Sequence, residues 1–189
     1  MLILGSSTIK RWPQTIHADL EPLSLLVRGF GGSTMNDALH FAERIAIRHK
    51  PRAVVVYEGD NDIAQGLRAE TVLRSFLALA ERIHRALPDT RIYAISIKPS
   101  LKRWALWPEI RRANALIAHA CAQDERMEYL DMVPPMLDAA GRPRPELFVQ
   151  DGLHLSVEGY ALWAQLLRGT LVESERPYEN AAGAGLARR

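Results

Sequence analysis

The 189-residue chain has little cysteine, little net charge and no long apolar run. Its single cysteine, Cys121, excludes an internal disulfide framework and a zinc site built from several cysteines. The formal net charge is +2, so there is no strong basic field of the kind that indicates nucleic-acid binding. No apolar run approaches the roughly 18 residues that a membrane-spanning helix requires. The remaining composition, 48% hydrophobic and 24% charged, is typical of a soluble globular protein.

The two ends of the chain predict the cellular location of the protein and the limits of its folded domain. The opening MLIL is too short for the apolar region of a secretory signal and no basic segment precedes it, so we expect a cytoplasmic protein. Secretion stays open if the natural chain begins earlier. The closing SERPYENAAGAGLARR is rich in Pro, Gly and Ala and has no hydrophobic periodicity. We expect one domain over residues 1–170 and a flexible tail over residues 171–189.

Five short apolar runs predict β-strands, at residues 2–4, 23–27, 53–57, 92–97 and 129–133. The third and fourth runs are continuous rather than alternating, which is typical of parallel strands covered on both faces. Amphipathic stretches predict helices at residues 35–49, 71–87, 108–122 and 157–170. This alternation predicts an α/β fold, a three-layer sandwich with about five parallel strands.

Ligands of such sheets bind beyond the carboxyl ends of the strands, so the residues after each strand are the first candidates for a site. GSST follows the first strand, RGFGGSTMND the second and EGDNDIAQG the third. KPSLKRW follows the fourth strand, and a long segment that contains DGLH follows the fifth. A hydroxyl, backbone and amide donors, and an Asp-His pair are the parts of an acyl-transfer site.

The DGLH segment places Asp151 three positions before His154, so one turn of chain can bring the carboxylate to the imidazole. The carboxylate would fix the tautomer of the ring and leave its other nitrogen free to accept a serine proton. The alternative is a loop aspartate and a partly exposed histidine that precede a helix.

The two blocks after the second and third strands offer hydrogen-bond donors. The backbone N–H of Gly32 and the side-chain amide of Asn61 could both point at an oxyanion. The alternatives are ordinary turns, since Gly, Asn and Asp are turn residues. Asp60 and Asp62 flank the asparagine, but a calcium loop would need an oxygen ligand at Ala64, so we expect no metal. Neither a GxGxxG motif nor a P-loop is present, which disfavours nucleotide binding.

The order of these blocks, each after a strand, resembles that of the SGNH hydrolases, the GDSL-like lipase and acylhydrolase family. The resemblance extends from Leu2 to about Leu167. It implies a flavodoxin-like fold and a reaction that needs no metal or organic cofactor. One position departs from the family pattern: Ser6 stands where the family has an aspartate, directly before the nucleophile. That residue is outside the triad, so we expect it to affect the rate and pH profile rather than the reaction class.

The resemblance also assigns roles. It implies that Ser7, the last residue of Gly-Ser-Ser, is the nucleophile, with His154 as base and Asp151 as the group that orients it. It further implies an oxyanion hole made of the Ser7 and Gly32 backbone N–H groups and the Asn61 side chain.

We therefore expect a serine carboxylic-ester hydrolase that acts on a small-molecule ester, either lysophospholipid-like or with a short acyl chain. Trp104 and Trp107 could form apolar walls, with Lys98, Lys102 and Arg103 near an anionic head group. Alternatively, the tryptophans pack a helix onto the sheet. Carbohydrate O-acetyl esters are the alternative substrate, and acyl transfer to an alcohol would use the same residues. A non-catalytic ligand-binding domain is the alternative of another class.

Overall fold

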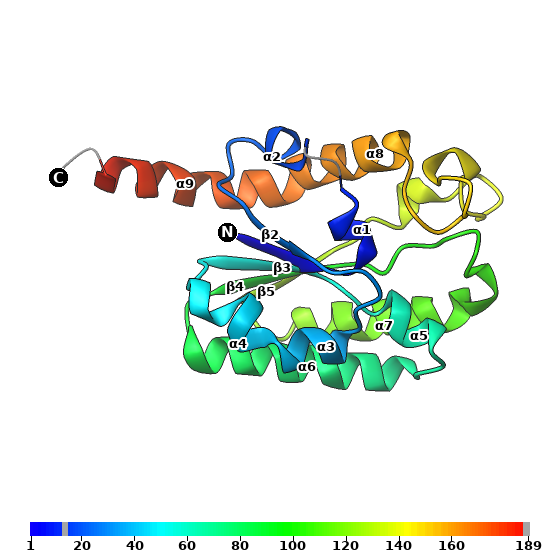
Figure 1. Ribbon diagram of the computed structural model, residues 1–189, viewed down its shortest axis with the longest axis horizontal. Helices are drawn as coiled ribbons and strands as arrows, with labels where there is room; N and C mark the ends of the chain where they lie inside the picture. The colour runs from blue at the N-terminus through cyan, green and yellow to red at the C-terminus, as the bar shows by residue number, and fades with distance from the viewer. Residues whose placement is uncertain (13–14, 187–189) are drawn as a thin grey trace.

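The computed structural model describes residues 1–12 and 15–186, with side chains described up to residue 179. Within these residues five strands form one sheet in the order β2-β1-β3-β4-β5 (Figure 1). The strands are β1 (Leu2–Gly5), β2 (Leu26–Gly29), β3 (Ala53–Tyr57), β4 (Arg91–Ile95) and β5 (Met127–Leu130). All neighbouring pairs are parallel. This is the strand order of the flavodoxin-like fold, so the fold prediction is confirmed.

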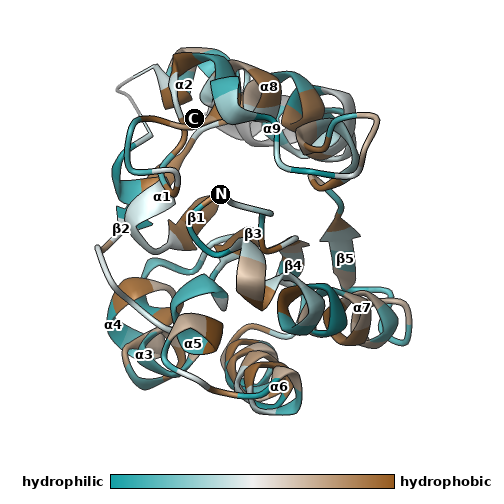
Figure 2. Cartoon of the chain, turned by 90° about the vertical axis from the view of Figure 1, so that its right-hand side faces the viewer, coloured by the Kyte–Doolittle hydropathy of each residue, from teal (hydrophilic) through white to brown (hydrophobic). Residues whose placement is uncertain are grey.

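Helices cover both faces of the sheet, which makes the three layers visible in Figure 2. One face carries α2 (Ile16–Asp19), α8 (Val157–Leu167) and α9 (Glu173–Leu186), and α1 (Ser7–Lys10) follows β1 on the same side. The other face carries α3 (Met35–His40), α4 (Ala42–Ile45), α5 (Asp60–Ala64), α6 (Ala69–Ala86) and α7 (Trp107–Cys121). Among the described helices, none combines the length and the apolar character that crossing a bilayer demands.

The strands supply two separate apolar cores because successive side chains point to opposite faces. Ile3, Val55 and Tyr93 pack under α8, whereas Val54 and Val56 pack against the opposite helical layer. Every residue of β3 is buried, which explains why this strand reads as a continuous apolar run. The continuous run is thus a consequence of having a core on each side.

Two predicted elements differ from the structure in their limits. The second strand begins at Leu26 rather than at residue 23, because Leu23 is buried in a turn beyond α2. The single helix predicted over residues 35–49 is divided into α3, α4 and a 3-10 turn at Ile47–His49. Lys50, at φ 46°, then ends the helical path before Pro51, a position where the right-handed helical conformation is disfavoured.

The C-terminal segment differs from the predicted tail. Residues Arg168–Val172 form a π-helical turn, and α9 continues to Leu186 and projects past the amino ends of the strands (Figure 1). Glu175 is completely buried and accepts hydrogen bonds from Arg52, Arg91 and Tyr93. Burial alone would raise the pKa of Glu175, but these donors outweigh burial and lower the pKa. The anchor is ionic rather than apolar, so hydrophobic periodicity does not reveal it. Residues 187–189 of the predicted tail lie outside the described residues.

Replacing Glu175 by Gln should test this anchor. The change leaves Arg52 and Arg91 without their carboxylate, so we expect the free energy of unfolding to fall by about 2–4 kcal/mol. Urea denaturation measures the difference. Glu173→Gln is the matched control on the same helix, since Glu173 is largely exposed and, among the described side chains, pairs only with Arg176. Its effect should stay within about 0.5 kcal/mol. Equal effects of the two changes would contradict the anchoring role.

Candidate active site

Three predicted site residues follow strands that end at the same level. Gly5 at the end of β1 pairs with Gly29 of β2 and with Tyr57 of β3. The chain then leads to Ser7, Gly32 and Asn61, respectively. The carboxyl ends of these strands therefore bring together three segments that are far apart in the sequence.

Ser7, His154 and Asp151 form a continuous hydrogen-bonded chain. His154 Nε2 lies 2.9 Å from Ser7 Oγ, and His154 Nδ1 lies 2.6 Å from Asp151 Oδ2. A neutral imidazole that donates from Nδ1 to the carboxylate keeps the lone pair of Nε2 directed at the serine hydroxyl. The arrangement can therefore remove the proton of Ser7 as its oxygen attacks an electrophile.

Asp151 holds its own turn as well as the ring. Its Oδ1 accepts the backbone N–H groups of Leu153 and His154, each at 2.9 Å, which leaves Oδ2 for the imidazole. Burial alone would raise the pKa of Asp151, but the hydrogen bonds from His154 and Leu153 outweigh it and hold the pKa well below its usual range. The carboxylate is therefore charged at neutral pH. The spacing of DGLH lets Asp151 accept the backbone N–H groups of its own turn and contact the imidazole as well.

The loop after β2 presents backbone N–H groups beside Ser7. A Cβ built on Gly31 would lie 4.0 Å from Ser7 Cβ, and Phe30 N donates to the Gly5 carbonyl. Gly32 takes φ 80°, a conformation that favours glycine, and a Cβ built on it would have no neighbouring atom within 4 Å. Within the described part of the chain, the backbone N–H groups of Ser7 and Gly32 have no hydrogen-bond acceptor. Both are free to bind an anionic oxygen.

Contacts at the start of α3 hold the loop that carries Gly32 in place. Thr34 and Asp37 form a reciprocal capping box, with the Thr34 side chain accepting from Asp37 N and the Asp37 side chain accepting from Thr34 N. Both carboxylate oxygens of Asp62 accept the backbone N–H of Met35. The second aspartate of GDND is therefore occupied by a structural contact.

Asn61 lies in α5, which begins directly after Gly59. Gly59 takes φ 108°, a conformation that strains other residues, and a Cβ there would also lie 2.6 Å from Ile97 Cδ1. Asn61 Nδ2 donates to the Ser33 carbonyl at 2.8 Å. The NH₂ group therefore points at the loop that carries Gly32, and one of its two hydrogens remains for a ligand.

Lys98 is buried rather than available to a substrate. Its ammonium donates to Thr8 Oγ1, Tyr57 OH and Asp60 Oδ2 at 3.1–3.2 Å. Burial alone would lower the pKa of Lys98, but Asp60 and Tyr57 outweigh it and raise the pKa above its usual value. The expectation that Lys98 lies near an anionic head group is therefore wrong. Its position in a polar loop segment gives no sign of burial, because the partners come from three other elements.

The two candidate tryptophans do not form a pair of open walls. Trp107 is buried in the apolar core and stacks on Trp104 at a centroid distance of 5.6 Å. Arg142 covers the Trp104 ring at 5.5 Å. For Trp107 the structure supports the packing alternative, because the residue is only 9% exposed and packs within the core. A substrate contact of Trp104 stays a prediction.

Glu58 is a buried carboxyl group that sequence reasoning missed. Its Oε1 lies 2.6 Å from Ser33 Oγ, and the same hydroxyl lies 2.9 Å from the Phe30 carbonyl. One hydroxyl hydrogen cannot serve two acceptors, so the geometry fits a protonated Glu58 that donates to Ser33, which donates onward. An acidic residue directly after the most buried strand was the available signal.

The surroundings of Glu58 favour its neutral form. Burial raises the pKa of Glu58 to about 8, and the nearby carboxylates of Asp62, Asp37 and Asp60 add to the rise. The hydrogen bond between Glu58 and Ser33 opposes the rise in pKa without cancelling it. Glu58 therefore joins β3 to the loop that carries Gly32 without adding a charge at neutral pH.

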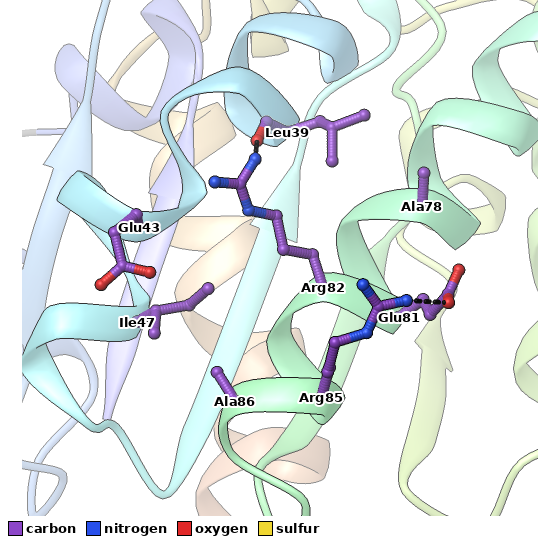
Figure 3. Close-up of a pocket in the computed structure, with 8 residues that line it drawn as sticks. All are labelled: Leu39, Glu43, Ile47, Ala78, Glu81, Arg82, Arg85 and Ala86. Carbon is purple, nitrogen blue, oxygen red and sulfur yellow. Dashed lines mark hydrogen bonds and ion pairs between the residues drawn. The ribbon is translucent and has the colours of Figure 1, made fainter.

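A groove of about 510 Å³ lies elsewhere, between the α3–α4 segment and α6 (Figure 3). Its cations are already engaged: Arg82 donates to the Leu39 carbonyl, and Arg85 pairs with Glu81. Figure 3 shows no hydroxyl, thiol or imidazole side chain among its lining residues. Across the described residues, no cluster of three or more His, Cys, Asp or Glu side chains is placed to hold a metal ion.

Comparison with known proteins relates the chain to one family. The model of the GDSL-like lipase/acylhydrolase family matches residues 5–162. No curated protein matches the chain. The family match spans all four blocks that carry the candidate site residues.

Solved structures share the fold. A GDSL-like lipase from Bacteroides thetaiotaomicron has 20% identity and a TM-score of 0.75, covering 92% of this chain and 87% of its own. A family 3 carbohydrate esterase from Clostridium thermocellum has 15% identity and a TM-score of 0.75, covering 94% and 96%. An acetyl esterase has 18% identity and a TM-score of 0.69, covering 94% and 98%.

The raised pKa of Glu58 predicts a pH-dependent stability. Between the ordinary value of 4.5 and about 8, the folded protein holds a proton that the unfolded chain releases. The free energy of unfolding should therefore fall as pH rises from about 5 to about 8, by at most about 1.4 kcal/mol per pH unit. Glu58→Gln keeps a neutral donor and cannot titrate, so its stability should vary less over this window.

Urea denaturation across this pH window measures the effect. Glu43→Gln, at an exposed position on α4, is the control and should follow the wild-type profile. Parallel profiles for the wild type and Glu58→Gln would show that Glu58 is already ionised at the lower pH.

Proposed function

The chain belongs to the GDSL-like lipase/acylhydrolase family, and on that premise we propose that it is a serine carboxylic-ester hydrolase acting on small-molecule acyl esters. The hydrogen-bonded chain from Asp151 through His154 to Ser7 carries this proposal. It joins segments separated by 147 residues, beside two N–H groups that have no acceptor in the described part of the chain. A nucleophile, a base, an orienting carboxylate and oxyanion donors are the full set that acyl transfer requires.

The acylation step begins at Ser7. Its Oγ attacks the ester carbonyl carbon while His154 Nε2 takes the hydroxyl proton, and Asp151 stabilises the resulting imidazolium. The carbonyl oxygen becomes an oxyanion, which the Ser7 and Gly32 N–H groups and the Asn61 amide bind. His154 then gives its proton to the leaving alcohol as the C–O bond breaks, and an acyl-enzyme remains.

Deacylation repeats the sequence with water. His154 removes a proton from the water molecule as its oxygen attacks the acyl carbon, and the same donors bind the second oxyanion. The bond to Ser7 Oγ breaks, the proton returns to that oxygen, and the carboxylic acid leaves. An alcohol in place of water would give acyl transfer by the same residues.

A short acyl group is the first candidate, since the solved structures of similar fold include an acetyl esterase. Gly31 and Gly32 are exposed and leave the oxyanion side open, while Lys98 is withdrawn into the protein. An anionic lipid head group therefore has less support than the sequence alone suggested. Carbohydrate O-acetyl esters are the second candidate substrate, because the similar folds include a carbohydrate esterase and an acetyl esterase.

A panel of esters should separate these substrates. We expect p-nitrophenyl acetate and short acyl esters to be hydrolysed with kcat/KM at least about tenfold above long-chain and lysophospholipid esters. Acetylated sugars form the second arm, and product analysis with added alcohols measures acyl transfer. A preference for long-chain lipids would overturn the short-acyl assignment.

Ser7→Ala should reduce kcat for p-nitrophenyl acetate by about 10⁴-fold or more, because it removes the nucleophile. It should also abolish labelling by a fluorophosphonate probe, followed by mass spectrometry. Ser6→Ala is the matched control: Ser6 is buried at the adjacent position, and we expect its replacement to keep most of the activity.

Three outcomes separate the possibilities. Loss in Ser7→Ala but not in Ser6→Ala supports the proposal. The reverse pattern would shift the nucleophile by one residue. A wild-type protein that neither binds the probe nor hydrolyses any ester would be a non-catalytic ligand-binding domain.

A further inference from the structure

The proposed oxyanion role of Asn61 depends on which way its amide points. The C=O and NH₂ groups of an amide have nearly the same shape, yet only the NH₂ group can donate to an oxyanion. We infer that Arg103 is a positioning residue that holds the Asn61 amide with its NH₂ group toward the Gly32 loop. This inference rests on the proposed function and adds a residue to its site.

Two contacts of opposite polarity define the amide orientation. Arg103 Nη2 lies 2.9 Å from Asn61 Oδ1, and Asn61 Nδ2 lies 2.8 Å from the Ser33 carbonyl oxygen. A guanidinium can only donate, and a carbonyl can only accept. A flipped amide would set donor against donor and acceptor against acceptor, so the two contacts together exclude it. The second hydrogen of Nδ2 then remains available to a ligand.

Arg103 is itself fixed by the residue next to Asn61. Its Nη1 forms an ion pair with Asp60 Oδ1 at 2.6 Å, and the other oxygen of Asp60 accepts from the buried Lys98. The Arg103 side chain is only 16% exposed. The planar guanidinium thus bridges two consecutive residues of α5, which a lysine with a single ammonium nitrogen would not reproduce.

The charge of Arg103 acts in the same direction. A cation that binds the amide oxygen draws electron density from the NH₂ group and strengthens it as a donor. The oxyanion forms only as the reaction proceeds, so stronger donation there accelerates the chemical step more than it tightens substrate binding.

The segment that carries Arg103 also contacts the loop of the base. Lys102 N donates to the carbonyl of Gly152 at 2.9 Å. Gly152 lies between Asp151 and His154 in the sequence. A replacement at Arg103 could therefore disturb the base as well as the amide. The experiment has to separate an effect transmitted through Asn61 from an effect on this loop.

A double-mutant cycle of Arg103→Met and Asn61→Ala makes that separation, with p-nitrophenyl acetate as substrate. Arg103→Met should lower kcat by about 10- to 100-fold with KM changed less than about threefold, since only donation to the oxyanion is lost. In the Asn61→Ala background the same replacement should change kcat by less than about twofold. An equal fall in both backgrounds, or no fall in either, would overturn the inference.

Two further variants guard against a general loss of structure. Arg103→Lys should lie between the wild type and Arg103→Met, and added guanidinium ion should partly restore kcat in Arg103→Ala. If Arg103→Met does not fold, these two decide the matter: no rescue and no graded effect would contradict a positioning role. Arg112→Met removes an exposed arginine that pairs with Glu70, and it should leave kcat unchanged.

A measurement that needs no activity distinguishes failure of this inference from failure of the proposed function. In ¹⁵N-labelled protein, the Asn61 NH₂ group should give two separate NMR signals that shift in Arg103→Met but not in Arg112→Met. Unmoved signals would overturn the positioning role. Shifted signals in a protein that hydrolyses no ester would support the positioning of Asn61 and reject the esterase proposal alone.

Discussion

The parallel register of β1, β2 and β3 is the constraint on which the rest of the candidate site depends. Because Gly5, Gly29 and Tyr57 end their strands at one level, the segments that follow lie together at a single edge. Each segment then contributes one group: a hydroxyl, a backbone N–H or an amide. The histidine comes from a separate loop and reaches this edge through one hydrogen bond. A slip between any two of these strands would separate the groups by more than a hydrogen bond can span.

Behind this edge lies a buried polar layer whose charges are paired or neutralised. The ammonium group of Lys98 donates to three acceptors, and the charge of Asp60 is neutralised by Lys98 and Arg103. Glu58 avoids the cost of a buried charge by holding its proton. Such a layer adds less to stability than an apolar core of equal volume, but it fixes directions, as an oxyanion hole requires. Paired charges likewise anchor α9, through Glu175, at the amino ends of β3 and β4.

Sequence reasoning succeeded where one local pattern has one structural cause. The limits of β3 follow from its apolar run, and the Asp151–His154 contact follows from their spacing within a single turn. It failed where partners are distant in the chain. Lys98 reads as a surface residue because its acceptors lie 38 to 90 positions away, and Glu175 reads as part of a tail for the same reason.

The sequence by itself determined the fold class, the family and the identities of the candidate groups at the strand ends. Strand periodicity and short motifs are local properties, so they can be recognised without knowing which residues they contact in the folded protein. Only the tertiary structure decided which loop cations are buried, that Glu58 is neutral, that Trp107 belongs to the core and which way the Asn61 amide points. Burial, pKa and amide orientation each depend on atoms brought near by folding, and the linear order of residues does not encode those distances locally.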